Sequence, residues 1–174
     1  TLGEADYPFS RHEFLLALEQ NHCLLEFGWQ PVYFCLYDKD QLIAAIPNFI
    51  KSNSYGELVF DHSWAQAYER SGRAYYPKLV SAIPYTPATG PRFLIHPEHQ
   101  SQQNPLKSAL INVIKSFCDQ HGFSGWHLLF ERESEIKSLN KEGLLYRHDC
   151  QFHWFNHDYS SFDDFLTRLI SRKR

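Results

Sequence analysis

The segment NPLKSALINVIKSFCDQHG, residues 104–122, is the feature that most constrains the fold of this chain. Asn104 is a typical N-cap residue, Pro105 suits the first helical position, and Gly122 is placed to end a helix. The apolar residues recur at intervals of three and four, as on one face of a helix: Leu106, Ala109, Leu110, Val113, Ile114, Phe117 and Cys118. A helix with one apolar face must pack on another layer, so the rest of the chain has to supply that layer.

Strand-like segments lie on both sides of this helix. Residues 31–52, PVYFCLYDKDQLIAAIPNFIKS, predict a hairpin whose turn is the polar stretch 38–40. Pro47 inside the second run indicates a bulge or an unpaired position. Further strands are expected at residues 56–60, in 75–95 on either side of a proline-rich loop, at 125–131 and, as a strand pair or one long bent strand, at 144–156.

Four more helices are expected between these strands. Residues 10–20 begin with a capping box formed by Ser10 and Glu13. The others are a short helix within 60–72, a weak helix at 134–142 and a last helix capped by Ser161. The alternation of strands and helices predicts one domain of the α/β class, a mixed α+β sheet with helices on both faces.

Composition limits the class of protein. The 174 residues suffice for one well-buried domain, and a net charge of −3 without a basic stripe argues against nucleic-acid binding. No signal peptide and no run of membrane-spanning length is present. The four cysteines lack metal-ligand spacing, so we expect reduced thiols, no bound metal and a cytoplasmic location. The absence of methionine indicates a processed chain or a fragment.

Several motifs, in this order, resemble the FemAB-like family of bacterial proteins: GWQPVYF, KSNSYGELVFDHSWAQAYERSGRAYYPKL, PYTPATGPRFL, GWHLLF and CQFHWFNHDYSSFDDFLTRLISRKR. The element order at residues 92–155 is also similar to the GNAT acyltransferase fold. The resemblance implies an N-acyltransferase related to peptidoglycan biosynthesis, built from two GNAT-like domains. On this basis residues 1–160 are expected to be the first domain, and 161–174 to begin the helix that leads to the second.

The resemblance also bears on an acyl donor. GNAT domains that bind acyl-CoA usually hold its pyrophosphate with a glycine-rich loop before the long helix. The corresponding stretch here, HPEHQSQQNP at residues 96–105, has no glycine, and Pro105 lacks an N–H group. We therefore expect no cofactor in this fragment, with acyl-CoA or aminoacyl-tRNA as the donors that a full-length protein would use.

The stretch FDHSWAQAYERSG, residues 60–72, carries large polar-tipped side chains on a short helix. Asp61, Trp64, Ala65 and Tyr68 share one helical face. One interpretation is an aromatic wall with a carboxylate at its rim, suited to a partly apolar acceptor. The other is that Asp61 caps the helix while Trp64 and Tyr68 pack on the sheet.

Two further charged residues lie in or beside β-rich runs. Glu57 is a candidate base for an amine acceptor, because a carboxylate with a raised pKa can take its proton. Lys78 is a candidate for binding a phosphate or carboxylate. The simpler interpretation is that both residues are exposed charges at a sheet edge or form one structural ion pair.

A last set of candidates lies in the strands expected near the centre of the sheet. Gln151 and His153 alternate with Phe152 and Trp154, so each pair shares one face. Because an imidazole group titrates near neutrality, His153 is a candidate acid or base, although a histidine satisfied in the core is the simpler interpretation. His127 is expected on a neighbouring strand.

The leading hypothesis is acyl or aminoacyl transfer to an amine, with this domain forming the acceptor side. Glu57 or Asp61 is the expected proton acceptor, and His153 is the second choice. The residues expected to contact the acceptor are Trp64, Tyr68, Lys78, His127, Gln151 and Trp154. The competing hypothesis is a non-catalytic domain that recognises a cell-wall peptide or carrier.

Overall fold

The computed structural model describes residues 7–148, 150 and 152–169. The chain divides into two compact units, Thr1–Leu144 and Leu145–Arg174, and each is described by itself. The first unit contains the sheet and the helices that pack on it. No helix in the described part of the chain is long and apolar enough to cross a membrane.

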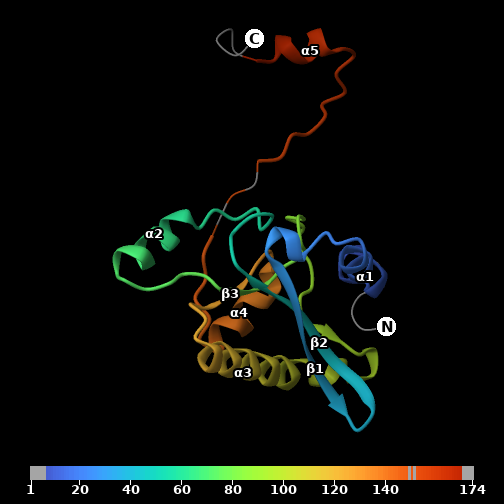
Figure 1. Cartoon of the computed structure of the whole chain (residues 1–174). Coiled ribbons are helices and arrows are strands. Elements are labelled where there is room, and N and C mark those ends of the chain that lie inside the picture. Colours follow the sequence, from blue (N-terminus) through green and yellow to red (C-terminus); the bar gives the residue numbers. More distant parts are fainter. Residues whose placement is uncertain (1–6, 149, 151, 170–174) are drawn as a thin grey trace. The chain divides into compact units, whose positions relative to one another are not determined.

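The first unit is built on a five-stranded mixed sheet (Figure 1). Strands β1 (Trp29–Asp38), β2 (Gln41–Lys51) and β3 (Lys78–Ser81) are antiparallel neighbours, and β5 (Trp126–Leu128) is parallel to β3. The short strand β4 (Leu94–Ile95) pairs with β2 beyond the end of β3. The predicted mixed α/β sheet is therefore confirmed.

The β1–β2 hairpin follows its predicted turn, with Lys39 at φ +53° between the two strands. Pro47 causes no bulge in it: Pro47 lies in register opposite Tyr33, and the irregularity falls at Leu36 instead. On the other side of β2, Pro47 lies in the gap between the pairings with β3 and β4. The missing N–H of Pro47 therefore costs no ladder hydrogen bond on that side.

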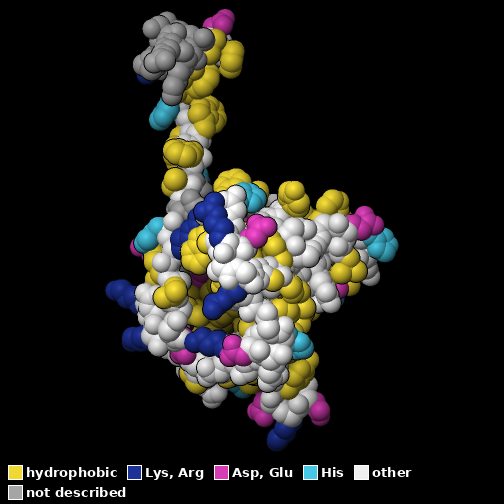
Figure 2. All heavy atoms as spheres, turned by 60° about the vertical axis from the view of Figure 1, so that its left-hand side comes forward, with side chains coloured by type: hydrophobic (Ala, Val, Ile, Leu, Met, Phe, Trp, Pro, Cys, Tyr) yellow, Lys and Arg dark blue, Asp and Glu magenta, His cyan; other side chains and the backbone are white. Residues whose placement is uncertain are grey.

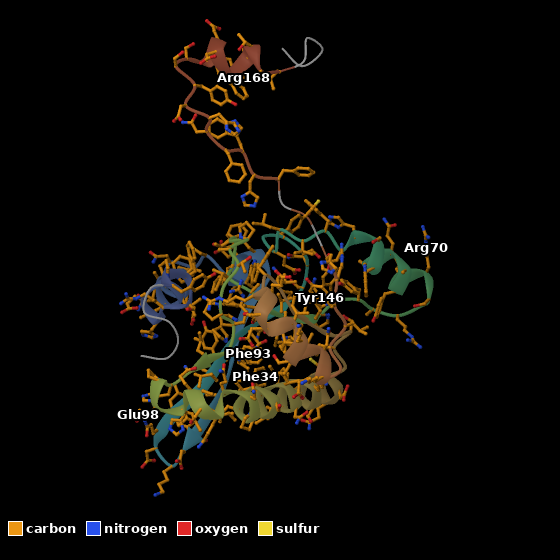
Figure 3. All side chains as sticks on the ribbon, turned by 180° about the vertical axis from the view of Figure 1, so that it is seen from behind. Phe34, Arg70, Phe93, Glu98, Tyr146 and Arg168 are labelled. Atoms are coloured by element: carbon orange, nitrogen blue, oxygen red, sulfur yellow. The ribbon has the colours of Figure 1, made fainter. Side chains whose placement is uncertain are left out.

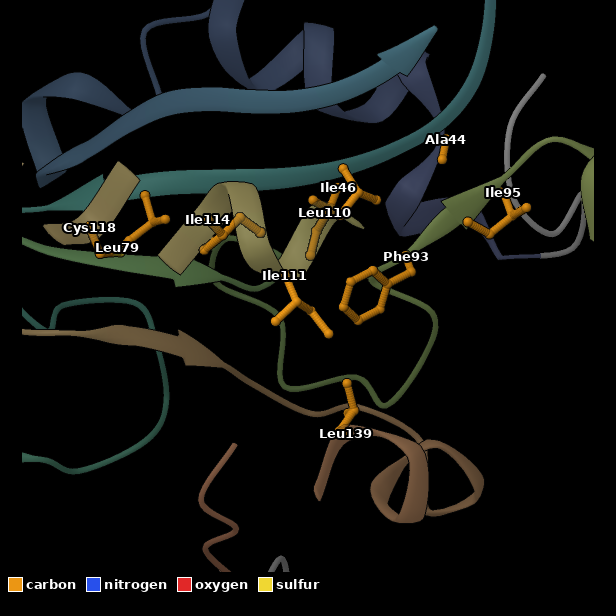
Figure 4. Close-up of a cluster of buried hydrophobic side chains, with 10 residues drawn as sticks. All are labelled: Ala44, Ile46, Leu79, Phe93, Ile95, Leu110, Ile111, Ile114, Cys118 and Leu139. Atoms are coloured by element: carbon orange, nitrogen blue, oxygen red, sulfur yellow. The ribbon is translucent and has the colours of Figure 1, made fainter. Parts of the chain in front are cut away.

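Helices cover both faces of the sheet. Helix α3 (Gln103–His121) contacts β1, β2 and β5, and α4 (Glu133–Lys141) adds Leu139 to the same apolar cluster. Figure 4 shows this cluster, with Leu110 of α3 next to Ile46 of β2. Phe34 and Phe93 also lie close to α3 (Figure 3).

The opposite face of the sheet packs against α1 (His12–Gln20) and the 3-10 turn η2 (Leu25–Phe27). Its apolar cluster consists of Leu15, Leu24, Trp29, Phe49, Val80 and Ala82. Because strand residues alternate between faces, neighbouring residues on β3 enter different clusters. Of the remaining elements, η1 (Pro8–Ser10) and α2 (His62–Arg70) lie outside these layers, and Arg70 points away from the sheet (Figure 3).

Four local predictions are wrong. Residues 56–60 form no strand, because Gly56 and Leu58 have φ values of +76° and +59°. Ser10 lies in η1 and donates to the Tyr7 carbonyl, so it does not cap α1. Asn104 lies within α3, because the 3-10 turn η3 (Pro97–Gln102) leads directly into that helix. Val113 is exposed, since the apolar stripe is wider than the face that packs.

The second unit contains the helix α5 (Phe162–Thr167), whose predicted cap is confirmed: Ser161 Oγ accepts a hydrogen bond of 3.1 Å from the Asp164 N–H. The strands predicted at 144–156 are absent from the described residues of that range. A strand needs a partner for its backbone groups, and the described part of this unit contains only one short helix. The domain boundary predicted after residue 160 stays a prediction.

Candidate active site

Two lysines meet at one level of the sheet, at the end of β2 and the start of β3. The register pairs Trp29 with Lys51 and Lys51 with Lys78, so the three side chains form a row across β1, β2 and β3 on one face. Both lysine residues are completely buried. Buried ammonium groups need compensating charges or hydrogen bonds, which the neighbouring segments must supply.

Two carboxylates compensate Lys78. Its Nζ donates to Glu57 Oε2 at 2.7 Å and also to Asp61 Oδ2. The same nitrogen lies 5.3 Å from the ring centre of Tyr75 and 5.8 Å from that of Tyr76. Glu57, Asp61 and Lys78 therefore form one buried ion cluster. The expectation of exposed charges at a sheet edge is wrong, whereas the alternative of an ion pair between Glu57 and Lys78 is confirmed.

Asp61 is the fixed anion of this cluster. It precedes α2, but its side chain makes no capping hydrogen bond. Its oxygens accept from Lys78, from Ser54 and, at 2.6 Å, from the Tyr75 hydroxyl. Burial opposes ionisation of Asp61, but these hydrogen bonds outweigh it and lower its pKa to about 2. Asp61 is therefore a poor proton acceptor at neutral pH.

Glu57 is held differently from Asp61. Lys78 occupies its Oε2, while Oε1 is buried and has no hydrogen-bond partner. The residue is 3% exposed. Burial raises the pKa of Glu57, and the hydrogen bond from Lys78 offsets only part of that effect. A carboxylate that has a raised pKa and one oxygen without a hydrogen-bond partner has the properties of a general base.

The loop that carries Glu57 is anchored on both sides. The Tyr55 carbonyl accepts hydrogen bonds from Lys51 Nζ at 3.0 Å and from Trp29 Nε1 at 3.1 Å. The next residue, Gly56, has a φ of +76°, and a Cβ there would lie 2.6 Å from the ring of Tyr85. Only glycine fits that position, so the loop before Glu57 is held in one conformation.

Lys51 has no carboxylate at ion-pair distance among the described residues. Its Nζ donates to the Tyr55 carbonyl, lies 3.5 Å from Phe27 O and from Asn53 Oδ1, and stands 3.9 Å above the ring of Trp29. Burial lowers the pKa of Lys51 to about 8, the charge of Glu57 opposes that change, and the charge of Lys78 adds to it. The pKa values of Lys51 and Glu57 are therefore linked.

Tyr75 connects the cluster to two other predicted site residues. Its ring centre lies 5.2 Å from that of Tyr68 and 6.1 Å from that of His127. The Tyr75 hydroxyl also lies 3.5 Å from His127 Nε2, while Tyr68 donates to the Ser124 carbonyl at 3.3 Å. The structure thus brings together five predicted residues: Glu57, Asp61, Lys78, Tyr68 and His127.

The structure does not place the other predicted residues in this cluster. Trp64 is half-exposed, and in the described part of the chain it takes no part in the hydrogen bonds of the cluster. His153 and Trp154 belong to the second unit, where His153 stacks on Phe155 and Trp154 lies beside Tyr159. Gln151 lies outside the described residues.

Exposed apolar side chains accompany the loop and α2: Tyr55, Leu58, Phe60 and Trp64. Figure 2, which brings the α2 side forward, shows hydrophobic side chains exposed among Lys and Arg side chains on this face. A bulky residue such as Leu58 at positive φ is a strained conformation of the kind that concentrates at functional sites.

Sequence reasoning missed four residues of the cluster: Lys51, Ser54, Tyr75 and Tyr76. The polar YYPK stretch before a buried strand was a signal, because a lysine that enters a sheet needs hydroxyl or carboxylate partners. Lys51, a charged residue at the end of an apolar strand, was a second signal of a buried polar site. Whether Lys51 and Lys78 lie side by side depends on the β2–β3 register, which the sequence does not specify.

The segment before α3 does not fit an acyl-CoA pyrophosphate. Residues 97–102 form the 3-10 turn η3, which continues directly into the helix, and Pro105 has no N–H group to offer. Lys107 in the first turns is engaged with Gln103 and Glu135. Among residues 7–148, 150 and 152–169, no group of three or more His, Cys, Asp or Glu side chains is arranged to hold a metal ion.

The fold and the cluster define a mixed α/β domain with a buried carboxylate–lysine site. The chain belongs to the FemAB-like family, described as peptidoglycan biosynthesis/recognition, which matches residues 1–174. No curated protein matches it. Among solved structures, it aligns with the aminoglycoside 6'-N-acetyltransferase AAC(6')-IG of Acinetobacter haemolyticus at 15% identity and a TM-score of 0.45, over 86% of this chain and 83% of that one.

Proposed function

We propose that this chain forms the acceptor side of an N-acyltransferase, which transfers an acyl or aminoacyl group to an amine. The observation that carries the proposal is Glu57 Oε1, a buried carboxylate oxygen without a partner. Membership in a family of peptidoglycan biosynthesis/recognition makes the amine of a peptidoglycan peptide the acceptor to test first.

The proposed chemistry assigns different roles to the two carboxylates. The amine nitrogen attacks the acyl carbonyl carbon, a C–N bond forms and the bond from the acyl group to its carrier breaks. Glu57 Oε1 accepts the proton that the amine loses. Asp61 keeps Lys78 in place as a permanent counter-charge, since its pKa of about 2 leaves it ionised. General-base help of this kind contributes about 10²- to 10⁴-fold in rate.

Tyr68, Tyr75 and His127 would form the aromatic surroundings of the amine. Their ring contacts and the hydrogen bond from Tyr75 to Asp61 keep this side of the site rigid. Such positioning contributes to catalysis by holding the acceptor for attack. The donor, acyl-CoA or aminoacyl-tRNA, would be bound by residues other than 96–105, because that stretch offers no cradle for a pyrophosphate.

The test uses a peptidoglycan stem peptide with a free amine, incubated with the 174-residue chain and either acetyl-CoA or aminoacyl-tRNA, with the product detected by mass spectrometry. Glu57→Gln should reduce transfer by about 10²-fold or more, because it removes the proton acceptor. Glu131→Gln is the matched control, since Glu131 Oε2 is also buried without a partner but lies outside the cluster. Equal transfer by both variants would contradict the role of Glu57.

The second candidate function is recognition of a cell-wall peptide without catalysis. The structure of the segment before α3 favours it, because residues 97–102 form a 3-10 turn that continues directly into the helix and not a glycine-rich cradle for a nucleotide-bearing donor. Binding of the stem peptide in calorimetry, together with no product from either donor, would favour this alternative over transfer.

A further inference from the structure

Few hydrogen-bond acceptors in the cluster remain unused. Lys78 donates to Glu57 Oε2, and Asp61 accepts from Lys78, Ser54 and Tyr75. Among the oxygens of these two carboxylates, Glu57 Oε1 is the one that is left without a partner. An ammonium group carries three N–H donors, whereas a neutral amine can donate a single N–H and keep its lone pair for attack.

The charges of the cluster already balance. The ammonium groups of Lys51 and Lys78 oppose the carboxylates of Glu57 and Asp61, and Lys51 is close enough for its charge to act on Glu57. A further ammonium would place an uncompensated positive charge in a buried site, which is costly. A neutral amine adds no charge.

The geometry points to a subsite at Glu57 Oε1 that binds the neutral amine of an α-amino group and discriminates against the ammonium of a lysine side chain. This inference rests on the proposed function and specifies its acceptor. An α-amino group with an ordinary pKa of about 7.7–8.0 is partly neutral at pH 7.5, whereas a lysine amine at about 10.4 is almost entirely charged.

Access to the subsite requires movement of the side chains around it. Since Glu57 is 3% exposed, an amine reaches Oε1 only when neighbouring side chains move aside. The side chain of Tyr55 is largely exposed. The Tyr55 carbonyl, in contrast, stays bound to Lys51 and Trp29, so side chains can move while the backbone before Glu57 remains fixed.

Titratable groups face Glu57 from each neighbouring element. Lys51 comes from β2, Lys78 from β3 and Asp61 from the residue before α2, while Tyr75 and Tyr76 precede β3. Burial raises the pKa of both tyrosines, so they stay neutral between pH 6 and 8. Within that range Lys51, whose pKa burial lowers to about 8, titrates together with the amine, so the binding of an α-amine should follow the protonation of both.

The test is calorimetry with two small probes: alanine amide, which has only an α-amine, and Nα-acetyl-lysine amide, which has only a side-chain amine. At pH 7.5 alanine amide should bind on the order of 10²-fold more tightly, the ratio of the neutral fractions. Titrations at pH 7 in buffers of different ionisation enthalpy should show release of close to one proton per alanine amide bound.

Variants and outcomes separate this inference from the proposed function. Glu57→Gln should abolish binding of alanine amide, and the control Glu131→Gln should leave it unchanged. Equal binding of the two probes, or binding of alanine amide without proton release, would overturn the neutral-amine subsite while an amine site at Glu57 stands. Binding of neither probe to the unaltered chain would overturn the proposed function as well.

Discussion

Two lysines lie opposite each other in this sheet, and their surroundings differ. Lys78 on β3 is neutralised by the carboxylates of Glu57 and Asp61. Lys51 on β2 has only carbonyl and amide oxygens and the ring of Trp29. Both are equally buried and belong to the same cross-strand pair.

The difference shows that the role of a buried lysine depends on its hydrogen-bond and ion-pair partners as well as on its burial. Lys78 is an anchor whose charge holds two carboxylates in place. For Lys51, burial lowers the pKa to about 8, within one unit of neutrality. Lys78 therefore fixes the geometry of Glu57. The charge of Lys51, which changes with pH near 8, affects the pKa of Glu57.

The largest expected effect comes from removing each lysine in turn. Lys78→Met leaves two buried carboxylates without their cation and should lower the free energy of unfolding by about 3–5 kcal/mol. Lys51→Met leaves the Tyr55 carbonyl bonded to Trp29 and should cost only about 1–2 kcal/mol. Urea denaturation at pH 7 measures both, and similar losses would remove the distinction between the two lysines.

A second prediction concerns the acid side of the Lys78 cluster. The folded-state pKa of Asp61, about 2, lies below its ordinary 3.8, so its contribution is complete above pH 3.8 and is lost as pH falls toward 2. The stability advantage of the unaltered chain over Asp61→Asn should therefore shrink by about 2 kcal/mol between pH 4.5 and 2. Chemical denaturation across that range measures it, and a constant difference would show that Asp61 is not stabilised as an anion.

The smallest expected effect belongs to Lys51 at alkaline pH. Its folded-state pKa of about 8 lies below the ordinary 10.5, so the cost of burying its charge disappears as pH rises through this interval. Between pH 8 and 9 the unaltered chain should gain about 1 kcal/mol relative to Lys51→Met. Lys51→Arg should show no such gain, because its guanidinium stays charged. Parallel curves for all three proteins would contradict the assignment.

Much of the architecture follows from the sequence. The apolar periodicity of α3, the polar turn after β1 and the cap at Ser161 each depend on local chemistry, and each led to the observed element. The failures have physical causes of a different kind. The run at 56–60 has strand-like residues, but Gly56 has a positive φ and lies so close to the ring of Tyr85, 29 residues away, that a Cβ would not fit, and no local pattern reveals this.

The candidate site was predictable to a similar degree. Glu57, Asp61 and Lys78 were recognised as charges in unusual places, and Asp61 with Tyr68 as members of one helical face. Ser54 and Tyr75 donate tertiary hydrogen bonds to Asp61, and these bonds decide that Glu57 is the carboxylate whose oxygen has no hydrogen-bond partner. Lys51 escaped notice because its importance comes from its position in register opposite Lys78.

The pairing of Lys51 with Lys78 has a consequence for the order of folding. The β1–β2 hairpin closes over a two-residue turn, so its contacts are local and should form early. Strand β3 arrives from 27 positions further along the chain, and its parallel neighbour β5 must wait for the crossover through α3. Both ammonium groups therefore remain hydrated until late in folding, and they should lose that water after the rate-limiting barrier. Mutations of Lys51 or Lys78 should then accelerate unfolding and leave the rate of folding almost unchanged.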